Sequence, residues 1–194
     1  MIGSLDAELS LSNSRGHTLT LNHSRISLKA GETAALTASV TPSDATDKKV
    51  SWSTSNSQIA SVDQSGRITA KKAGQAVITA KAGEKSASCT ITVSLAAPAA
   101  LKTKITGTGT IALTWNSVKG ADGYEIYRTA GKSKTYKKIA SVKGKTAYID
   151  KKKTVGTAYT YKVRAYSGKI YSAFSKAVKT MARPFRPALS LKAG

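Results

Sequence analysis

The chain has 194 residues, of which 40% are hydrophobic and 6% aromatic, and its formal net charge is +21 at pH 7. Its single cysteine, Cys89, excludes an intramolecular disulfide and a metal site built from cysteines. No apolar run reaches the ~20 residues that a membrane helix needs, so we expect no membrane insertion. The first residues also lack the charged and then apolar layout of a signal peptide.

Composition changes across residues 95–100. Residues 1–100 contain no tyrosine and carry 10 basic against 7 acidic residues, a net charge of +3. Residues 101–194 contain all eight tyrosines and carry 21 basic against 3 acidic residues, a net charge of +18. A one-sided charge attracts anionic polymers without specifying a fold. The change predicts two domains of ordinary size, joined by a short linker that its one proline stiffens.

The first half alternates apolar and polar residues with the period of two that marks half-buried strands. Residues 1–17 are interpreted as a linker or tag remnant. Trp52 is the expected core residue of its strand, and Cys89 alternates with Ile91 and Val93 on an inward face, where a thiol acts as a small hydrophobe. Strands are predicted around residues 19–21, 26–28, 34–40, 49–53, 59–62, 67–70, 76–80 and 87–93.

Short strands separated by regular turn signals are typical of an Ig-like β-sandwich. Over residues 18–94, the sequence resembles the bacterial Ig-like group 2 family. The resemblance implies a module of a secreted or cell-surface bacterial protein. The segments that carry it are Ile26-Ser-Leu-Lys-Ala-Gly-Glu32, Val50-Ser-Trp-Ser-Thr-Ser-Asn56, Ile59-Ala-Ser-Val-Asp63, Gly66-Arg-Ile-Thr-Ala70 and Gly74-Gln-Ala-Val-Ile-Thr-Ala80.

The second half predicts another sandwich over residues 101–182. Ile111, Leu113 and Trp115 alternate inward along one strand, and Tyr124 begins the next strand with its side chain toward the same core. The clearest alternation is in residues 156–165, where the side chains of Tyr159, Tyr161, Val163 and Ala165 are expected to point inward and those of Thr160, Lys162 and Arg164 outward. Further strands are predicted at residues 124–128, 137–140, 146–149 and 173–178.

The strand ending in Trp115, the Ala-Asp-Gly-Tyr sequence that ends at Tyr124, and the Tyr-x-Tyr-x-Val-x-Ala strand resemble a fibronectin type III domain over residues 97–182. The resemblance implies that Tyr159 is a tyrosine corner, a buried phenol that hydrogen bonds to the backbone. Removal of the Tyr159 hydroxyl is expected to lower stability, whereas removal of the Tyr127 hydroxyl is not. The fold class is therefore all-β, with two tandem Ig-like β-sandwiches joined by a short linker. Residues 183–194 form a C-terminal linker whose last residues echo the start of a further module.

Catalytic chemistry is scarce in the sequence. The two histidines, His17 and His23, lie at the entry to the first module, and Asp44 and Asp47 flank a loop without the spacing of a calcium loop. The serines form no nucleophile elbow. We therefore expect no enzyme activity, no cofactor and no metal in this chain.

The tyrosines and lysines of the second half form the candidate surface for glycans or anionic polymers. Alternatively, they are ordinary outer-face residues that cover apolar surface and discourage pairing of sheet edges. Because lysines far outnumber arginines, no specific nucleic-acid binding is expected. The candidate residues are Tyr127, Tyr136, Lys137, Lys138, Tyr148, Tyr166 and Tyr171.

Two functions remain open at this point. The first is a monomeric spacer or adhesion segment of a secreted or cell-surface bacterial protein, whose basic second domain is drawn to cell-wall polymers, glycans or host proteins. The second is an accessory segment of an extracellular enzyme that acts on polysaccharide or peptidoglycan.

Overall fold

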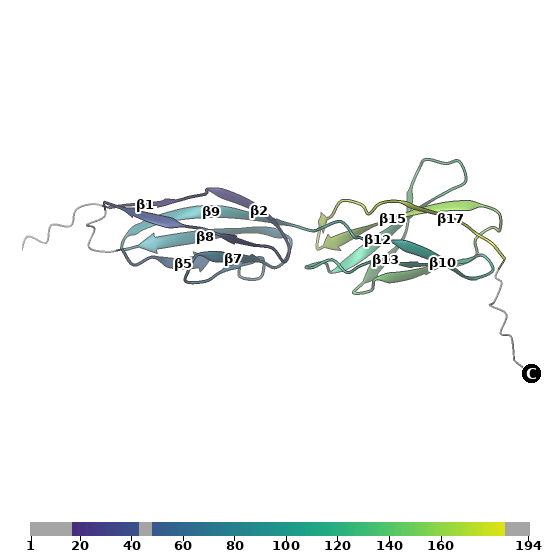
Figure 1. The fold of residues 1–194 in the computed structure, drawn as a ribbon, viewed down its shortest axis with the longest axis horizontal. Coiled ribbons are helices and arrows are strands. Elements are labelled where there is room, and N and C mark those ends of the chain that lie inside the picture. The colour runs from purple at the N-terminus through teal and green to yellow at the C-terminus, as the bar shows by residue number, and fades with distance from the viewer. Residues whose placement is uncertain (1–16, 43–47, 185–194) are drawn as a thin grey trace, which may run out of the picture.

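The computed structural model describes residues 17–42 and 48–184. Figure 1 shows two β-sandwiches arranged end to end, which the chain enters one after the other. This confirms the all-β class and the tandem arrangement. The predictions for residues 1–16, for the loop of Asp44 and Asp47, and for the segment Pro187–Gly194 lie outside the described residues.

The N-terminal sandwich contains three sheets, with strand orders β2-β9-β8-β5, β3-β7-β6 and β1-β4. The pairing of β2 with β9 is parallel, and the other pairs are antiparallel. The strands are β1 (Thr18–Leu21), β2 (Arg25–Lys29), β3 (Thr33–Ala35), β4 (Ala38–Thr41), β5 (Ser51–Thr54), β6 (Ala60–Val62), β7 (Arg67–Ala70), β8 (Gly74–Ala82) and β9 (Lys85–Ser94).

The single strand predicted at residues 34–40 is two strands, β3 and β4, which join different sheets. Between them, the Leu36 N–H donates to the Gly66 carbonyl oxygen at 2.9 Å. The next N–H, that of Thr37, donates to the Asn22 side chain at 2.9 Å. The hydrophobic alternation continues through this change because both sheets cover the same interior, so periodicity alone does not reveal it.

The core of the N-terminal sandwich has two neighbouring hydrophobic clusters. Cys89 is fully buried in the larger one beside Ile91, as predicted, and burial raises the pKa of its thiol. Trp52 is only half-buried, but its ring packs against both clusters. It therefore bridges the two parts of the core and does not fill the centre of one.

The C-terminal sandwich has two facing sheets. One has the order β10-β11-β14, and the other has the order β13-β12-β15-β16, with β17 also paired to β15. The strands are β10 (Lys102–Gly107), β11 (Thr110–Thr114), β12 (Gly123–Ala130), β13 (Lys137–Lys143), β14 (Ala147–Asp150), β15 (Ala158–Ser167), β16 (Ile170–Tyr171) and β17 (Val178–Met181).

Aromatic side chains organise the core of the C-terminal sandwich. Trp115 and Tyr124 meet edge to face, with ring centroids 5.4 Å apart. The Tyr124 hydroxyl accepts a hydrogen bond from the Val118 N–H at 2.7 Å. The inward residues of β15 are buried as the alternation predicts, and Tyr161 is fully buried.

The predicted closing strand at residues 173–178 is displaced, and regular pairing with β15 begins only at Val178. Before that point, serine hydroxyls accept hydrogen bonds from the β15 backbone where strand carbonyls would otherwise do so. The Ser172 hydroxyl accepts from the Ala165 N–H at 2.9 Å, and the Ser175 hydroxyl accepts from the Val163 N–H at 3.1 Å. The segment between these two serines contains Phe174, whose ring packs against the outward side chains of β15.

The Tyr159 hydroxyl accepts a hydrogen bond from the Thr154 N–H at 3.1 Å, the geometry expected of a tyrosine corner. We predict that Tyr159→Phe lowers the free energy of unfolding of the C-terminal sandwich by about 1 kcal/mol, because the Thr154 N–H loses its acceptor. Urea unfolding followed by tryptophan fluorescence measures the change.

Tyr127 is the wrong control for this experiment, because its hydroxyl is hydrogen bonded to Glu125 and Arg164. Tyr171 is a better control, since it is 46% exposed and the loss of its hydroxyl keeps the ring that packs against Arg164. If Tyr171→Phe destabilised the protein as much as Tyr159→Phe, Tyr159 would not be a tyrosine corner.

Candidate functional site

Two regions of the structure could carry function: the contact between the sandwiches, called the joint below, and the outer face of the five-stranded sheet. At the joint, Leu95 follows directly after β9 and is 6% exposed. Leu95 and Ala73 both belong to the hydrophobic cluster of the C-terminal sandwich, together with Trp115 and Val118. The core of the second sandwich therefore includes residues that the first sandwich positions.

An ion pair also crosses the joint. Lys72 Nζ lies 3.1 Å from Asp122 Oδ1. The other carboxylate oxygen of Asp122 accepts hydrogen bonds from the Ser167 hydroxyl at 3.1 Å and from the Gly168 N–H at 2.9 Å. The bond from Gly168 and the neighbouring Lys72 lower the pKa of Asp122. Contacts within its own sandwich therefore position Asp122 for the ion pair with Lys72.

The backbones approach closely beside this ion pair. Gly120 has a φ of +74°, and a Cβ atom on it would lie 2.8 Å from the Ala30 Cβ and 2.8 Å from the Lys71 carbonyl oxygen. Both neighbours belong to the N-terminal sandwich, so a larger residue would force the sandwiches apart.

The linker itself contacts the second sandwich. The Ala99 carbonyl oxygen accepts a hydrogen bond from the Asn116 N–H at 2.9 Å, and Leu101 is buried in the core. An apolar groove of about 630 Å³ is lined by the linker, including Pro98, and by residues that include Phe174 and Val178. The linker is therefore held against the second sandwich by a backbone hydrogen bond and by the burial of Leu101.

The second region is the outer face of the sheet formed by β12, β13, β15, β16 and β17, called the cation–aromatic face below. Its centre is Glu125, a carboxylate that is only 4% exposed. Arg164 donates to Glu125 Oε2 through Nε at 2.9 Å and Nη2 at 2.7 Å. Lys138 Nζ donates to Oε1 at 2.9 Å, and the Tyr127 hydroxyl donates to Oε2 at 3.1 Å. Burial alone would raise the pKa of Glu125, but these donors outweigh it and hold the pKa below its ordinary value.

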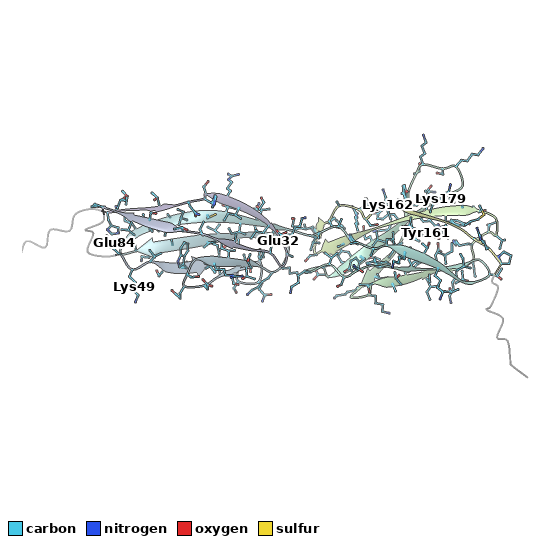
Figure 2. All side chains as sticks on the ribbon, viewed as in Figure 1. Glu32, Lys49, Glu84, Tyr161, Lys162 and Lys179 are labelled. Carbon is cyan, nitrogen blue, oxygen red and sulfur yellow. The ribbon has the colours of Figure 1, made fainter. Side chains whose placement is uncertain are left out.

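Aromatic rings surround the cations on this face. The Arg164 guanidinium lies 4.0 Å from the centroid of the Tyr171 ring and 5.4 Å from that of Phe174. Lys162 Nζ lies between two rings, 4.1 Å from the centroid of Tyr136 and 4.0 Å from that of Phe174. Such contacts hold each cation and ring in a defined position. Figure 2 shows Lys162 and Lys179 on the same side of the C-terminal sandwich, consistent with the register that pairs Lys179 with Thr160.

The structure brings together most of the predicted surface residues but not all of them. Tyr148 belongs to β14 of the other sheet and packs against the core. Lys137 lies opposite Arg128 in the strand register, on the side of the sheet opposite to Tyr127. Five predicted residues lie on the cation–aromatic face: Tyr127, Tyr136, Lys138, Tyr166 and Tyr171.

Sequence reasoning missed four members of the cation–aromatic face as site residues: Glu125, Lys162, Arg164 and Phe174. The outward positions of Lys162 and Arg164 were visible in the alternation of β15, which was the available signal. The position of Phe174 depends on the serine hydrogen bonds of Ser172 and Ser175, for which the sequence offers no comparable signal.

The carboxylates of the C-terminal sandwich are all engaged. Asp122 pairs across the joint and Glu125 lies in the cation–aromatic face. Asp150, which is 5% exposed, accepts hydrogen bonds from Arg128 at 2.7 Å and from the Tyr161 hydroxyl at 2.8 Å. These three are the only acidic residues after residue 100. The many lysines on this sandwich therefore have no free carboxylate of the same domain to pair with.

Within residues 17–42 and 48–184, no group of three or more histidine, cysteine, aspartate or glutamate side chains is arranged to hold a metal ion. Over the same residues, no helix is long and apolar enough to cross a membrane.

Comparison with known proteins decides the family of the first sandwich. Residues 17–93 match the model of the bacterial Ig-like domain, group 2. The N-terminal sandwich is a bacterial Ig-like domain of group 2. The resemblance on which the sequence analysis relied is thereby confirmed for this half of the chain.

Among sequence relatives, part of this chain is similar to segments of two glycosidases. One is the lacto-N-biosidase of Bifidobacterium bifidum, 49% identical over 69 residues, which are 35% of this chain and 6% of that protein. The other is the 3-O-alpha-D-galactosyl-alpha-L-arabinofuranosidase of Bifidobacterium longum subsp. longum, 50% identical over 56 residues, 29% of this chain and 5% of that protein. The match spans only a small part of each relative's length.

Among solved structures, the structure of FN3tt mut is similar to this chain, with 31% sequence identity and a TM-score of 0.41. The match covers 46% of this chain and 97% of that one.

Glu125 lets the ion pairs of the cation–aromatic face be tested. We predict that Glu125→Gln lowers the free energy of unfolding by about 2 kcal/mol, because Arg164 and Lys138 lose their shared buried partner. Chemical denaturation of both proteins measures this difference. Glu84→Gln is the matched control, since Glu84 is exposed in a turn of the N-terminal sandwich at the end away from the joint (Figure 2). An equal loss of stability in the two variants would contradict the role of Glu125.

The pKa of Glu125 also predicts a pH dependence. Because its pKa is lower in the folded than in the unfolded protein, the stability that Glu125 contributes is fully present above the ordinary value of 4.5 and is lost as the pH falls through the folded pKa. The difference in unfolding free energy between wild type and Glu125→Gln should therefore be constant near neutral pH and shrink below about pH 4. A difference that grows on acidification would contradict this sign.

Proposed function

We propose that the chain is a non-catalytic spacer segment of a longer secreted or cell-surface bacterial protein, in which it holds neighbouring domains at a set distance and orientation. The contacts between the two sandwiches at the joint support this proposal. Relative motion is the usual expectation for linked domains unless their interface restrains it. Here apolar packing of Leu95, the ion pair of Lys72 with Asp122 and the close approach at Gly120 all restrain the same contact.

A spacer benefits from restraints of different physical kinds. Burial of Leu95 favours contact between the sandwiches but is tolerant of their rotation. The ion pair selects a rotation, since it requires Lys72 to face Asp122, although an exposed pair contributes less than about 1 kcal/mol. The absence of a side chain at Gly120 lets its backbone approach Ala30 and Lys71 more closely than a larger residue would.

A second candidate function, compatible with the first, is an accessory segment of an extracellular enzyme that acts on polysaccharides. It is supported by the glycosidases whose segments resemble part of this chain. In such a protein, catalysis would reside in another domain, and this chain would set the reach of that domain from its point of attachment.

The distance distribution between the two sandwiches tests the spacer proposal. Spin labels on Ser53→Cys and Ala147→Cys would report it, since both positions are exposed and lie in different sandwiches. The native Cys89 is buried and should remain unlabelled. We predict one narrow distribution by pulsed electron paramagnetic resonance. A broad distribution, as expected for a flexible linker, would contradict the proposal.

Variants at the joint should broaden this distribution. Gly120→Ala places a Cβ against Ala30 and Lys71, so we expect it to widen or shift the distance peak. Gly144→Ala is the matched control, because Gly144 also has a positive φ, +63°, but a Cβ there meets nothing within 4 Å. Lys72→Ala should broaden the peak slightly and Lys71→Ala should not.

A further inference from the structure

We propose that the cation–aromatic face is a binding site for an anionic polysaccharide, a glycan chain that carries carboxylate or sulfate groups. The proposal is separate from the spacer role, since it concerns one face of the C-terminal sandwich and would hold even if the joint were flexible. It rests on the charge balance of this sandwich, on the arrangement of its outward side chains and on their exposure.

The charge balance favours an anionic partner. All three carboxylates of the C-terminal sandwich are engaged in ion pairs, and two of them are at most 5% exposed. An approaching polyanion would therefore meet lysines with almost no carboxylate to repel it. Anionic polymers release their counterions when lysines replace them, which favours association at low and moderate salt.

The strand register sets the cations in rows across the face. Lys138 of β13 lies opposite Tyr127 of β12, which lies opposite Lys162 of β15. In the row beside it, Thr160 of β15 lies opposite Lys179 of β17. Neighbouring strands are about 4.8 Å apart, so the backbone positions of these lysines follow a line across the sheet, about 10 Å from β13 to β15 and about 5 Å from β15 to β17. A repeating anionic chain is a suitable partner for such a line.

Three rings give this face more than charge. Tyr136, Phe174 and Tyr171 are held by their contacts with Lys162 and Arg164 and so present a fixed apolar surface among the cations. Tyr171 is 46% exposed and lies close along the chain to the exposed Lys169. The apolar face of a sugar ring can pack against such a surface while its carboxylate meets an ammonium group.

The hydrogen bonds of Arg164 disfavour recognition of nucleic acid. Arg164 donates to Glu125 through Nε and Nη2, so this edge of its guanidinium is not free for bidentate recognition of a phosphate or a base.

Isothermal titration calorimetry with polygalacturonate, a carboxylated glycan, tests the proposal on the intact chain. The comparison probes are poly-L-glutamate, which has carboxylates but no sugar rings, the neutral glucan dextran, and an oligothymidylate. We expect polygalacturonate to bind at least tenfold more tightly than any of the three. Equal binding of poly-L-glutamate or oligothymidylate would overturn the assignment to a glycan, and equal binding of dextran would overturn the role of charge.

Two double variants with the same loss of charge locate the site. Lys162→Ala with Lys179→Ala should weaken polygalacturonate binding about tenfold, on the basis of roughly fivefold or less per lysine near an anionic surface. Lys102→Ala with Lys104→Ala changes exposed residues of β10 in the opposite sheet and should weaken binding by less than threefold. Equal effects of the two pairs would show that net charge alone attracts the polymer and would overturn the site.

Tyr171→Ala completes the test of the rings. It should weaken binding of polygalacturonate several-fold and leave that of poly-L-glutamate unchanged, provided that the thermal midpoint of the variant matches wild type. If its midpoint falls, Tyr171→Leu keeps apolar cover over Arg164 and should show the same selective loss. Equal loss for both probes, or none for polygalacturonate, would remove the rings from the site.

Discussion

The insertion of Leu95 into the core of the C-terminal sandwich is the contact on which the overall arrangement depends. Leu95 comes directly after β9, whose position is set by pairing with both β8 and β2. Its side chain packs with residues of the other sandwich, so it ties the end of one fold to the interior of the next. The ion pair of Lys72 with Asp122 and the contact at Gly120 restrain the same interface between the sandwiches.

The few carboxylates of the C-terminal sandwich are also used for contacts within the fold. With three carboxylates for 21 basic residues in its half of the chain, each carboxylate is placed where it neutralises cations that the fold itself requires. Asp150 serves Arg128 and Tyr161, and burial and its hydrogen bond to Asp150 raise the pKa of Tyr161. Glu125 serves Arg164 and Lys138. Lys153 also pairs with Asp150, and Lys162 packs between two rings; the remaining lysines of this sandwich in the described part of the chain are exposed, which gives the surface a single sign of charge.

Local pattern predicted much of the fold and little of the site. The alternation of residues 67–70 predicted β7 with its observed bounds, and that of residues 156–165 predicted which side chains of β15 are buried. Alternation assigns a side chain to one of two faces, but it does not say which residues of other strands lie beside it. The network around Glu125 and the rings around Lys162 join residues from separate strands and loops, so these contacts can be predicted only when the strand register is known. The position of Phe174 depends on two serine hydroxyls that replace backbone acceptors, and the joint depends on contacts between residues more than 20 positions apart.

Residual dipolar couplings test most directly whether the joint holds the two sandwiches in one orientation. Backbone N–H couplings of the weakly aligned protein would be fitted for each sandwich separately. Fixed contacts at Leu95, Lys72 and Gly120 predict that both sandwiches have the same alignment tensor, in magnitude and in direction. Tensors of clearly different magnitude would mean that the sandwiches move independently, and would contradict the central role of the joint.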